Sequence, residues 1–282
     1  MLTLILTCVP LSLFIGIAAS AIGYTAWSLI MPILFVFFGF DIYLALFISL
    51  LIDSANAILV TFLAARKKEV DFRLGTKLVI FACFIVLIGI YLGTTFIPDH
   101  TEFFKDSVAY GNLIFVFFFF HRGRKIAKIN SQPTQTLSSE NNEAIQEKEK
   151  SQLHTVFLYL GISFIAIQTG LIGVGGGMMY AVFMMFLLKF STVKATGTAM
   201  FITSITALVA ATGIFLQIPD RVLENNNQLV IIPIIVVFSL VGTLVGKKIS
   251  NRLSEENVNY LVSAVVAIAC LVAILQKNAI SQ

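Results

Sequence analysis

The chain has 282 residues, of which 58% are hydrophobic and only 12% are charged, and its mean hydropathy is +0.93. Soluble domains carry about 25% charged residues. The composition therefore excludes a soluble enzyme, a disordered chain and a disulfide-stapled secreted module, and it indicates an integral membrane protein. The net charge of +4 is modest and gives no reason to expect a nucleic-acid partner.

The first 40 residues carry no charge. Further uncharged stretches follow at 42–52, 54–65, 78–98, 155–188, 195–219, 225–246 and 257–276. A helix needs about 20 apolar residues to cross a bilayer core. Because the runs are continuous rather than alternating, they favour helices over a β-barrel. We expect an all-α integral membrane protein with about 8–10 membrane helices.

The segment 121–154 is hydrophilic: it begins with basic residues and continues with polar residues and charges of both signs. We interpret it as a cytoplasmic linker with one helical stretch near 140–152. It divides the chain into a first transmembrane repeat at 1–120 and a second at 155–277.

The two halves resemble each other at an offset near 150 residues: Phe40 corresponds to Phe190 and Ser54 to Ser204. Each half contains a long apolar segment broken by small residues, a tight turn, and a span rich in Ser, Thr or Asn. Internal duplication is common in transporters.

The first apolar segment of each half, 4–38 and 155–188, either crosses the membrane once or turns back as a hairpin. If each turns back, the second repeat is inverted relative to the first. Inversion moves several basic residues to the cytoplasmic side: Lys189, Lys194, Lys247, Lys248 and Arg252. The positive-inside rule therefore favours two inverted-topology repeats with broken or re-entrant helical hairpins, both termini extracytoplasmic and the linker cytoplasmic.

A glycine cluster interrupts the second of these segments, at Gly170, Gly173, Gly175, Gly176 and Gly177. Each glycine costs about 1 kcal/mol relative to alanine inside a helix, so the cluster predicts a broken helix or very close packing. A helix that restarts after the break would point free N–H groups into the protein, and such a terminus binds anions. Plain packing of small residues between helices is the alternative.

The stretch from Gly170 to Gly177, the run KATGTA at 194–199, and GTLVGKK at 242–248 resemble the sulfite exporter TauE/SafE family. The resemblance covers nearly the whole chain outside the linker. It implies a transporter of a small sulfur-containing anion such as sulfite or a sulfonate, driven by an ion gradient, in the cell (plasma or inner) membrane. The first half departs from the family, because Gly23-Tyr24-Thr25-Ala26-Trp27 stands where a second glycine-rich break is expected. Gly23 and Thr25 are the binding candidates there.

Asp53 is an acid well inside an expected span, 42–63. A charge at the bilayer centre costs about 2.5–3.5 kcal/mol on insertion scales, so Asp53 should face the interior. It is either a proton carrier whose protonation alternates with anion binding, or a structural partner for Asn56 or a helix cap. An ionised acid beside an anion site repels the anion, whereas the protonated acid does not. Protonation of Asp53 would therefore be coupled to anion binding.

Hydroxyl and amide side chains in matching positions of the two halves complete the binding candidates: Ser54, Asn56, Thr203, Ser204 and Thr206. These groups suit an oxyanion; the alternative is that each hydroxyl bonds to its own helix. Lys194 either attracts anions at the inner mouth or anchors its span at the interface.

Together these features favour a secondary transporter with alternating access. The partners would be a small anionic substrate, a coupling ion, which we expect to be a proton, and the lipid bilayer. The cysteines and histidines form no metal-binding pattern, and we expect no cofactor and no enzymatic activity. A passive anion channel on the same scaffold and an assembly factor without transport are the alternatives.

Overall fold

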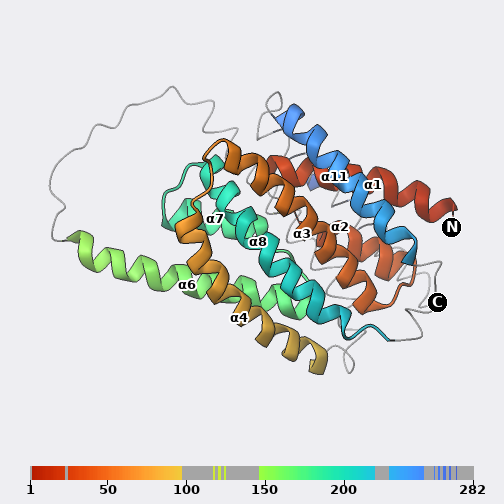
Figure 1. The fold of residues 1–282 in the computed structure, drawn as a ribbon, viewed down its shortest axis with the longest axis horizontal. Helices are drawn as coiled ribbons and strands as arrows, with labels where there is room; N and C mark the ends of the chain where they lie inside the picture. Colours follow the sequence, from red (N-terminus) through yellow and green to blue (C-terminus); the bar gives the residue numbers. More distant parts are fainter. Residues whose placement is uncertain are drawn as a thin grey trace.

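The computed structural model describes residues 2–22, 25–96, 146–219 and 229–250, together with a few single positions between 117 and 271. Every regular element in this part of the chain is helical (Figure 1). The elements are α1 (Leu2–Ile22), α2 (Trp27–Met31), the π-helix η1 (Pro32–Phe37), α3 (Ile42–Arg66), α4 (Phe72–Phe96), α6 (Gln146–Ile172), α7 (Gly177–Leu187), α8 (Thr192–Phe215) and α11 (Ile231–Ser250). The expected all-α class is confirmed.

Four of these helices, α3, α4, α8 and α11, are long and apolar enough to cross a membrane, and the apolar parts of α1 and α6 are shorter. Large apolar side chains project from α4 and are more than half exposed: Ile80, Phe84, Leu87 and Tyr91. Their spacing of three and four residues places them on one helix face. Such a face suits lipid, so the chain is a multi-pass membrane protein.

The order of α1, the half-helix α2–η1 and α3 recurs as α6, α7 and α8. The equivalent boundaries lie 150 residues apart: Trp27 and Gly177 begin the half-helices, Phe37 and Leu187 end them, and Ile42 and Thr192 begin the next helices. The loop hydrogen bond from Phe40 N to Leu34 O likewise has a counterpart from Phe190 N to Met184 O. The offset that the sequence indicated is therefore present in the backbone.

The equivalent helices α3 and α8 cross antiparallel at the centre of the bundle (Figure 1). The Ser54 hydroxyl, halfway along α3, donates to the Ser204 carbonyl oxygen, halfway along α8, at 3.0 Å. Phe47 near the start of α3 packs on Phe215 at the end of α8, with ring centroids 5.2 Å apart. The two equivalent helices therefore run in opposite directions where they touch.

Glycines let two further helix pairs approach closely. α1 packs on α11, and α4 packs on α6, on opposite sides of the α3–α8 pair (Figure 1). A Cβ on Gly242 would overlap the Leu13 carbonyl oxygen, and one on Gly170 would overlap the Val86 carbonyl oxygen. Small residues allow such backbone contact between membrane helices, so Gly170 is a packing residue.

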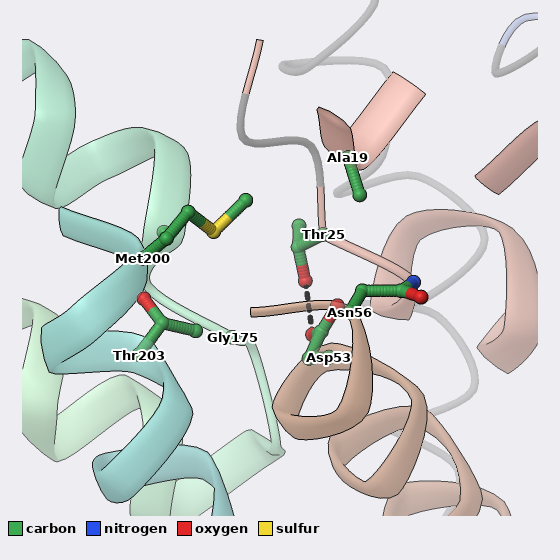
Figure 2. A pocket seen from close by; sticks show the side chains of 8 residues that line it. Ala19, Thr25, Asp53, Asn56, Gly175, Met200 and Thr203 are labelled. Carbon is green, nitrogen blue, oxygen red and sulfur yellow. Dashed lines mark hydrogen bonds between the residues drawn. The ribbon is translucent and has the colours of Figure 1, made fainter. Parts of the chain in front are cut away.

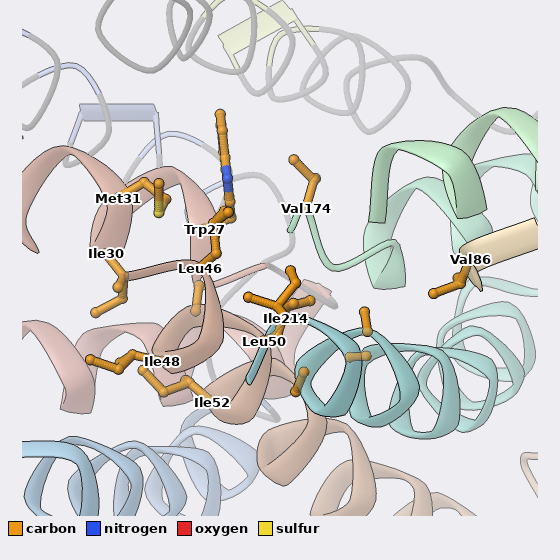
Figure 3. Close-up of a cluster of buried hydrophobic side chains, with 14 of the residues drawn as sticks. Trp27, Ile30, Met31, Leu46, Ile48, Leu50, Ile52, Val86, Val174 and Ile214 are labelled. Atoms are coloured by element: carbon orange, nitrogen blue, oxygen red, sulfur yellow. The ribbon is translucent and has the colours of Figure 1, made fainter. Parts of the chain in front are cut away.

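Apolar side chains fill the space between the half-helices and the crossing. Trp27 from α2, Leu46 and Leu50 from α3, Val174 from the second break and Ile214 from α8 gather there (Figure 3). Trp27, the single tryptophan of the chain, is 5% exposed. The core therefore holds both breaks against the central helix pair.

The boundaries of the expected linker fall mostly outside the described residues. α6 begins at Gln146, inside the segment 121–154 and inside the helical stretch expected near 140–152. The second repeat is thus continuous with the last part of that segment.

Candidate substrate site

The first break lies between α1 and α2. Gly23 and Tyr24 fall outside the described residues, whereas Thr25 and Ala26 are buried and precede α2 directly. The Trp27 N–H lies 3.4 Å from Thr25 Oγ1, so Thr25 caps the half-helix. This break presents one hydroxyl and the first amides of a helix to α3.

The second break, Gly173–Gly176, separates α6 from α7 as the glycine cluster predicted. Gly173 has φ +69°, in the left-handed region that favours glycine. A Cβ on Gly175 would overlap Asp53 Oδ2. One glycine is therefore required by backbone conformation and another by the close approach of a carboxyl group.

The second hairpin turns back partway along the bundle. Gly176 lies against Ile165, and Gly161 lies against Phe183, so α7 returns antiparallel beside α6. Gly175 at the break contacts Asp53, which is near the middle of α3. The turn of the second hairpin therefore lies at the level of the middle of α3.

The Asp53 carboxyl group lies where the two breaks meet, and it is 5% exposed. Oδ2 accepts a hydrogen bond from Thr25 Oγ1 at 2.6 Å, and Oδ1 accepts one from the Ala26 N–H at 2.6 Å. The Gly175 backbone amide makes a further hydrogen-bonding contact. Asp53 thus occupies an anion cradle whose donors come from both halves of the chain, at the N-terminal ends of two half-helices.

A narrow pocket surrounds this carboxyl group. It is lined by both repeats: Ala19, Thr25, Asp53 and Asn56 from the first, and Gly175, Gly177, Met200 and Thr203 from the second. Figure 2 shows Met200 and Thr203 on α8 facing Thr25 and Asp53 on the other side. The walls leave no space for a water molecule, so the pocket is closed in this conformation.

Asn56 is tied to α11 rather than to Asp53. Its Oδ1 accepts hydrogen bonds from the hydroxyls of Ser239 at 3.2 Å and Thr243 at 3.0 Å. Its Nδ2 is buried and has no hydrogen-bond partner among the described residues. In the described part of the chain, the Asp53 side chain on α3 instead accepts hydrogen bonds from Thr25 and Ala26 just before α2. It therefore caps the start of α2, which is the helix-cap alternative predicted from the sequence.

The remaining hydroxyl candidates bond mainly to backbone. Thr203 donates to the Ala199 carbonyl at 3.0 Å and Thr206 to the Ile202 carbonyl at 2.9 Å, each within α8. Of the hydroxyls on α8, Thr203 lines the pocket, while Ser204 and Thr206 do not. Ser54, Gly173 and Gly176 also lie outside its lining and support the crossing and the break.

Lys194 lies at the start of α8 and does not line the pocket. Its Nζ pairs with Asp71 Oδ2 at 3.1 Å and lies 4.4 Å from the centre of the Phe190 ring. The Asp71 N–H also donates to Thr198 Oγ1 at 3.0 Å. The hydrogen bond from the Leu74 N–H, followed by the contact with Lys194, holds the pKa of Asp71 below its usual range.

Several residues in and around the pocket were not predicted from the sequence. Ala26 contributes a backbone amide, which no sequence pattern marks, and Ala19 and Met200 are apolar residues in apolar helices. Ser239 and Thr243, the partners of Asn56, stand four residues apart beside Gly242. That helical spacing of polar side chains was the one available signal.

A family model described as "Sulfite exporter TauE/SafE" matches residues 8–273, which is nearly the whole chain. No curated protein and no solved structure matches this chain.

Proposed function

We propose that this chain, which belongs to the sulfite exporter TauE/SafE family, is a proton-coupled secondary transporter of a small sulfur-containing anion such as sulfite or a sulfonate. The observation that carries the proposal is the Asp53 carboxyl group held by donors from both breaks in a closed central pocket. The arrangement is a ready-made oxyanion site that already contains an acid.

The coupling follows from competition for the same donors. An entering oxyanion needs the Thr25 hydroxyl and the amides of Ala26 and Gly175, which the carboxylate of Asp53 engages. A bound oxyanion and the Asp53 carboxylate would share the same donors, and two negative charges so close together repel strongly in a medium of low dielectric constant. A proton on Asp53 removes its charge and frees the donors, so proton and anion bind together and leave together.

Asn56 and Thr203 would complete the cage, because both line the pocket and Asn56 Nδ2 is an unused donor among the described residues. Neutral donors hold an anion without a full opposing charge, which keeps its release fast. Since the pocket is closed, the anion enters only when the two repeats move apart. Rocking about the α3–α8 crossing would open the pocket to one side at a time.

We also propose inverted repeats with the α3–α4 turn facing the cytoplasm. The ion pair between Asp71 and Lys194 supports this, since it brings two basic segments, 66–77 and 189–194, to one end of the bundle. A parallel duplication would separate these segments. Cysteines placed at Lys68 and Lys189 should label from the same side, and one at Leu216, at the other end of α8, from the opposite side.

The transport test is uptake of labelled sulfite into proteoliposomes with an imposed pH gradient. Wild-type protein should show flux that follows the proton gradient, and Asp53→Asn should lose that dependence. Asp41→Asn is the matched control, because Asp41 caps α3 far from the pocket through the amides of Tyr43 and Leu44, and asparagine caps equally well.

Sulfite itself takes up a proton near neutral pH, and this contributes the same proton dependence to wild type and to Asp53→Asn, so the difference between the two proteins isolates Asp53. Proton dependence of equal size in wild type and Asp53→Asn would contradict the coupling. Flux without proton dependence in wild type is the result expected of a passive channel. The absence of flux with sulfite, methanesulfonate and short carboxylates would contradict transport and favour an assembly factor.

A further inference from the structure

A second pocket lies at the basic end of the bundle, well separated in sequence from the central site. It has a volume of about 300 Å³ and is lined by Asp71, Arg73, Leu74, Lys77, Leu188 and Phe190. These residues come from the start of α4 and from the turn between α7 and α8. A volume of this size is at the lower end of that found for small-molecule sites.

The cationic side of this pocket is formed by Arg73 and Lys77. They stand four residues apart on the first turns of α4 and therefore lie on one helix face. The single acid in the lining, Asp71, is paired with Lys194 and also feels the charge of Arg73, whereas neither Arg73 nor Lys77 forms a close ion pair with a described residue. The pocket thus offers two cations to a ligand.

The rest of the lining is apolar. Leu74, Leu188 and Phe190 are each partly exposed, and Phe190 is held in place by the Lys194 ammonium group above its ring. A bare inorganic anion would leave these apolar residues unused. A ligand with an anionic head and a short apolar chain would use both the cationic and the apolar residues.

We propose that this pocket binds the oxyanion head of an amphiphile, with Arg73 and Lys77 on the sulfonate or phosphate group and Leu74, Leu188 and Phe190 along the hydrocarbon part. An alkyl sulfonate and an acidic phospholipid share this chemistry. The site shares no lining residue with the transport site. The proposal can be tested independently of transport, because the test measures ligand binding to purified protein.

Basic residues at the cytoplasmic end of membrane helices also act as topology anchors. The control variants must therefore separate ligand binding from anchoring of the helix end. Lys67 and Lys68 stand at the same end but do not line the pocket. Lys67→Gln/Lys68→Gln therefore removes the same charge as Arg73→Gln/Lys77→Gln without touching the site.

The test has two arms on full-length protein in non-ionic detergent. Calorimetric titration with hexanesulfonate and methanesulfonate probes a soluble ligand, and native mass spectrometry after incubation with phosphatidylglycerol and phosphatidylcholine probes a lipid. We expect Arg73→Gln/Lys77→Gln to weaken the binding of the anionic amphiphile at least about tenfold, in line with two charge-assisted contacts. Lys67→Gln/Lys68→Gln should change it less than about twofold. Phe190→Ala should reduce the preference for hexanesulfonate over methanesulfonate, which a purely electrostatic effect would not alter.

Hexanesulfonate binding that depends on Arg73 and Lys77 would establish a site for a soluble amphiphile. Retention of phosphatidylglycerol over phosphatidylcholine with the same dependence would establish a lipid site. Equal effects of the two double variants, or no binding of either probe to wild type, would overturn the proposal. Circular dichroism and size-exclusion profiles matching those of wild type show that each variant is folded.

Discussion

Replacing Asp53 tests whether its carboxyl group holds the two breaks together. Asp53→Ala removes the carboxyl group that accepts hydrogen bonds from the Thr25 hydroxyl and the Ala26 amide in a closed pocket. Loss of a buried acceptor costs about 1–3 kcal/mol for each hydrogen bond, so the loss of both should lower the free energy of unfolding by about 2–6 kcal/mol. Asp53→Asn keeps one carbonyl oxygen and should lose about 1–3 kcal/mol.

The assay is thermal unfolding in detergent, followed with a thiol-reactive fluorescent dye. Cys8 is fully buried and Cys83 is partly buried, so both become reactive when the bundle opens. The same substitutions at Asp41 are the control: Asp41→Ala should cost about 1 kcal/mol as a lost helix cap, and Asp41→Asn almost nothing. If Asp53→Ala unfolds at the wild-type temperature or above, the cradle contributes no stability and the reasoning fails.

Three further predictions follow from particular contacts. Gly175→Ala should abolish flux while Gly213→Ala largely preserves it, because the first Cβ overlaps the Asp53 carboxyl group and the second meets only the apolar side chain of Ile90, closest at its flexible end; equal flux in the two variants would contradict this. Thr25→Val should impair both flux and stability by about 1–3 kcal/mol, and Thr25→Ser should restore them, since a hydroxyl donor to Asp53 is what matters; a failure of serine to rescue would assign the effect to packing. The lowered pKa of Asp71 means that its ionised form stabilises the fold at neutral pH and that this contribution is lost as the pH falls below about 4. The melting temperature of Asp71→Asn should therefore decline less than that of wild type between neutral and acidic pH, and parallel declines would refute the role of the Asp71–Lys194 contact.

Much of the fold was predictable because the bilayer restricts the choices. Continuous uncharged runs long enough to cross the membrane favoured helices over a β-barrel, and the Gly173–Gly177 cluster favoured a broken helix over plain close packing. The offset of 150 residues was visible in pairs such as Ser54 and Ser204, which then meet at the crossing. The position of the second hairpin's turn, level with the middle of α3, was not predictable, because a full and a partial hairpin give the same distribution of charge.

The chemistry of the site was predictable from the sequence, whereas the residues that form it were predictable only in part. Asp53, Thr25 and Gly175 were named because a membrane acid, a hydroxyl and a glycine break each carry a recognisable cost or conformation. The hydroxyls of Ser204 and Thr206 were named for the same chemical reason, yet their donors turn to nearby carbonyls. Sequence alone does not show which way a hydroxyl points, and it does not show that the Ala26 amide would be exposed by the break.

The most direct test of the central claim is whether an anion and the Asp53 carboxylate compete for the same donors. Trp27 lies two residues from Thr25 and is the single tryptophan, so its fluorescence reports binding at the pocket. Methanesulfonate is the probe, because it stays ionised over the whole pH range used. Its affinity for wild-type protein should weaken as the pH rises from mildly acidic to mildly basic, with one proton taken up per anion bound, and its affinity for Asp53→Asn should stay constant. The same pH dependence in wild type and Asp53→Asn would contradict the account.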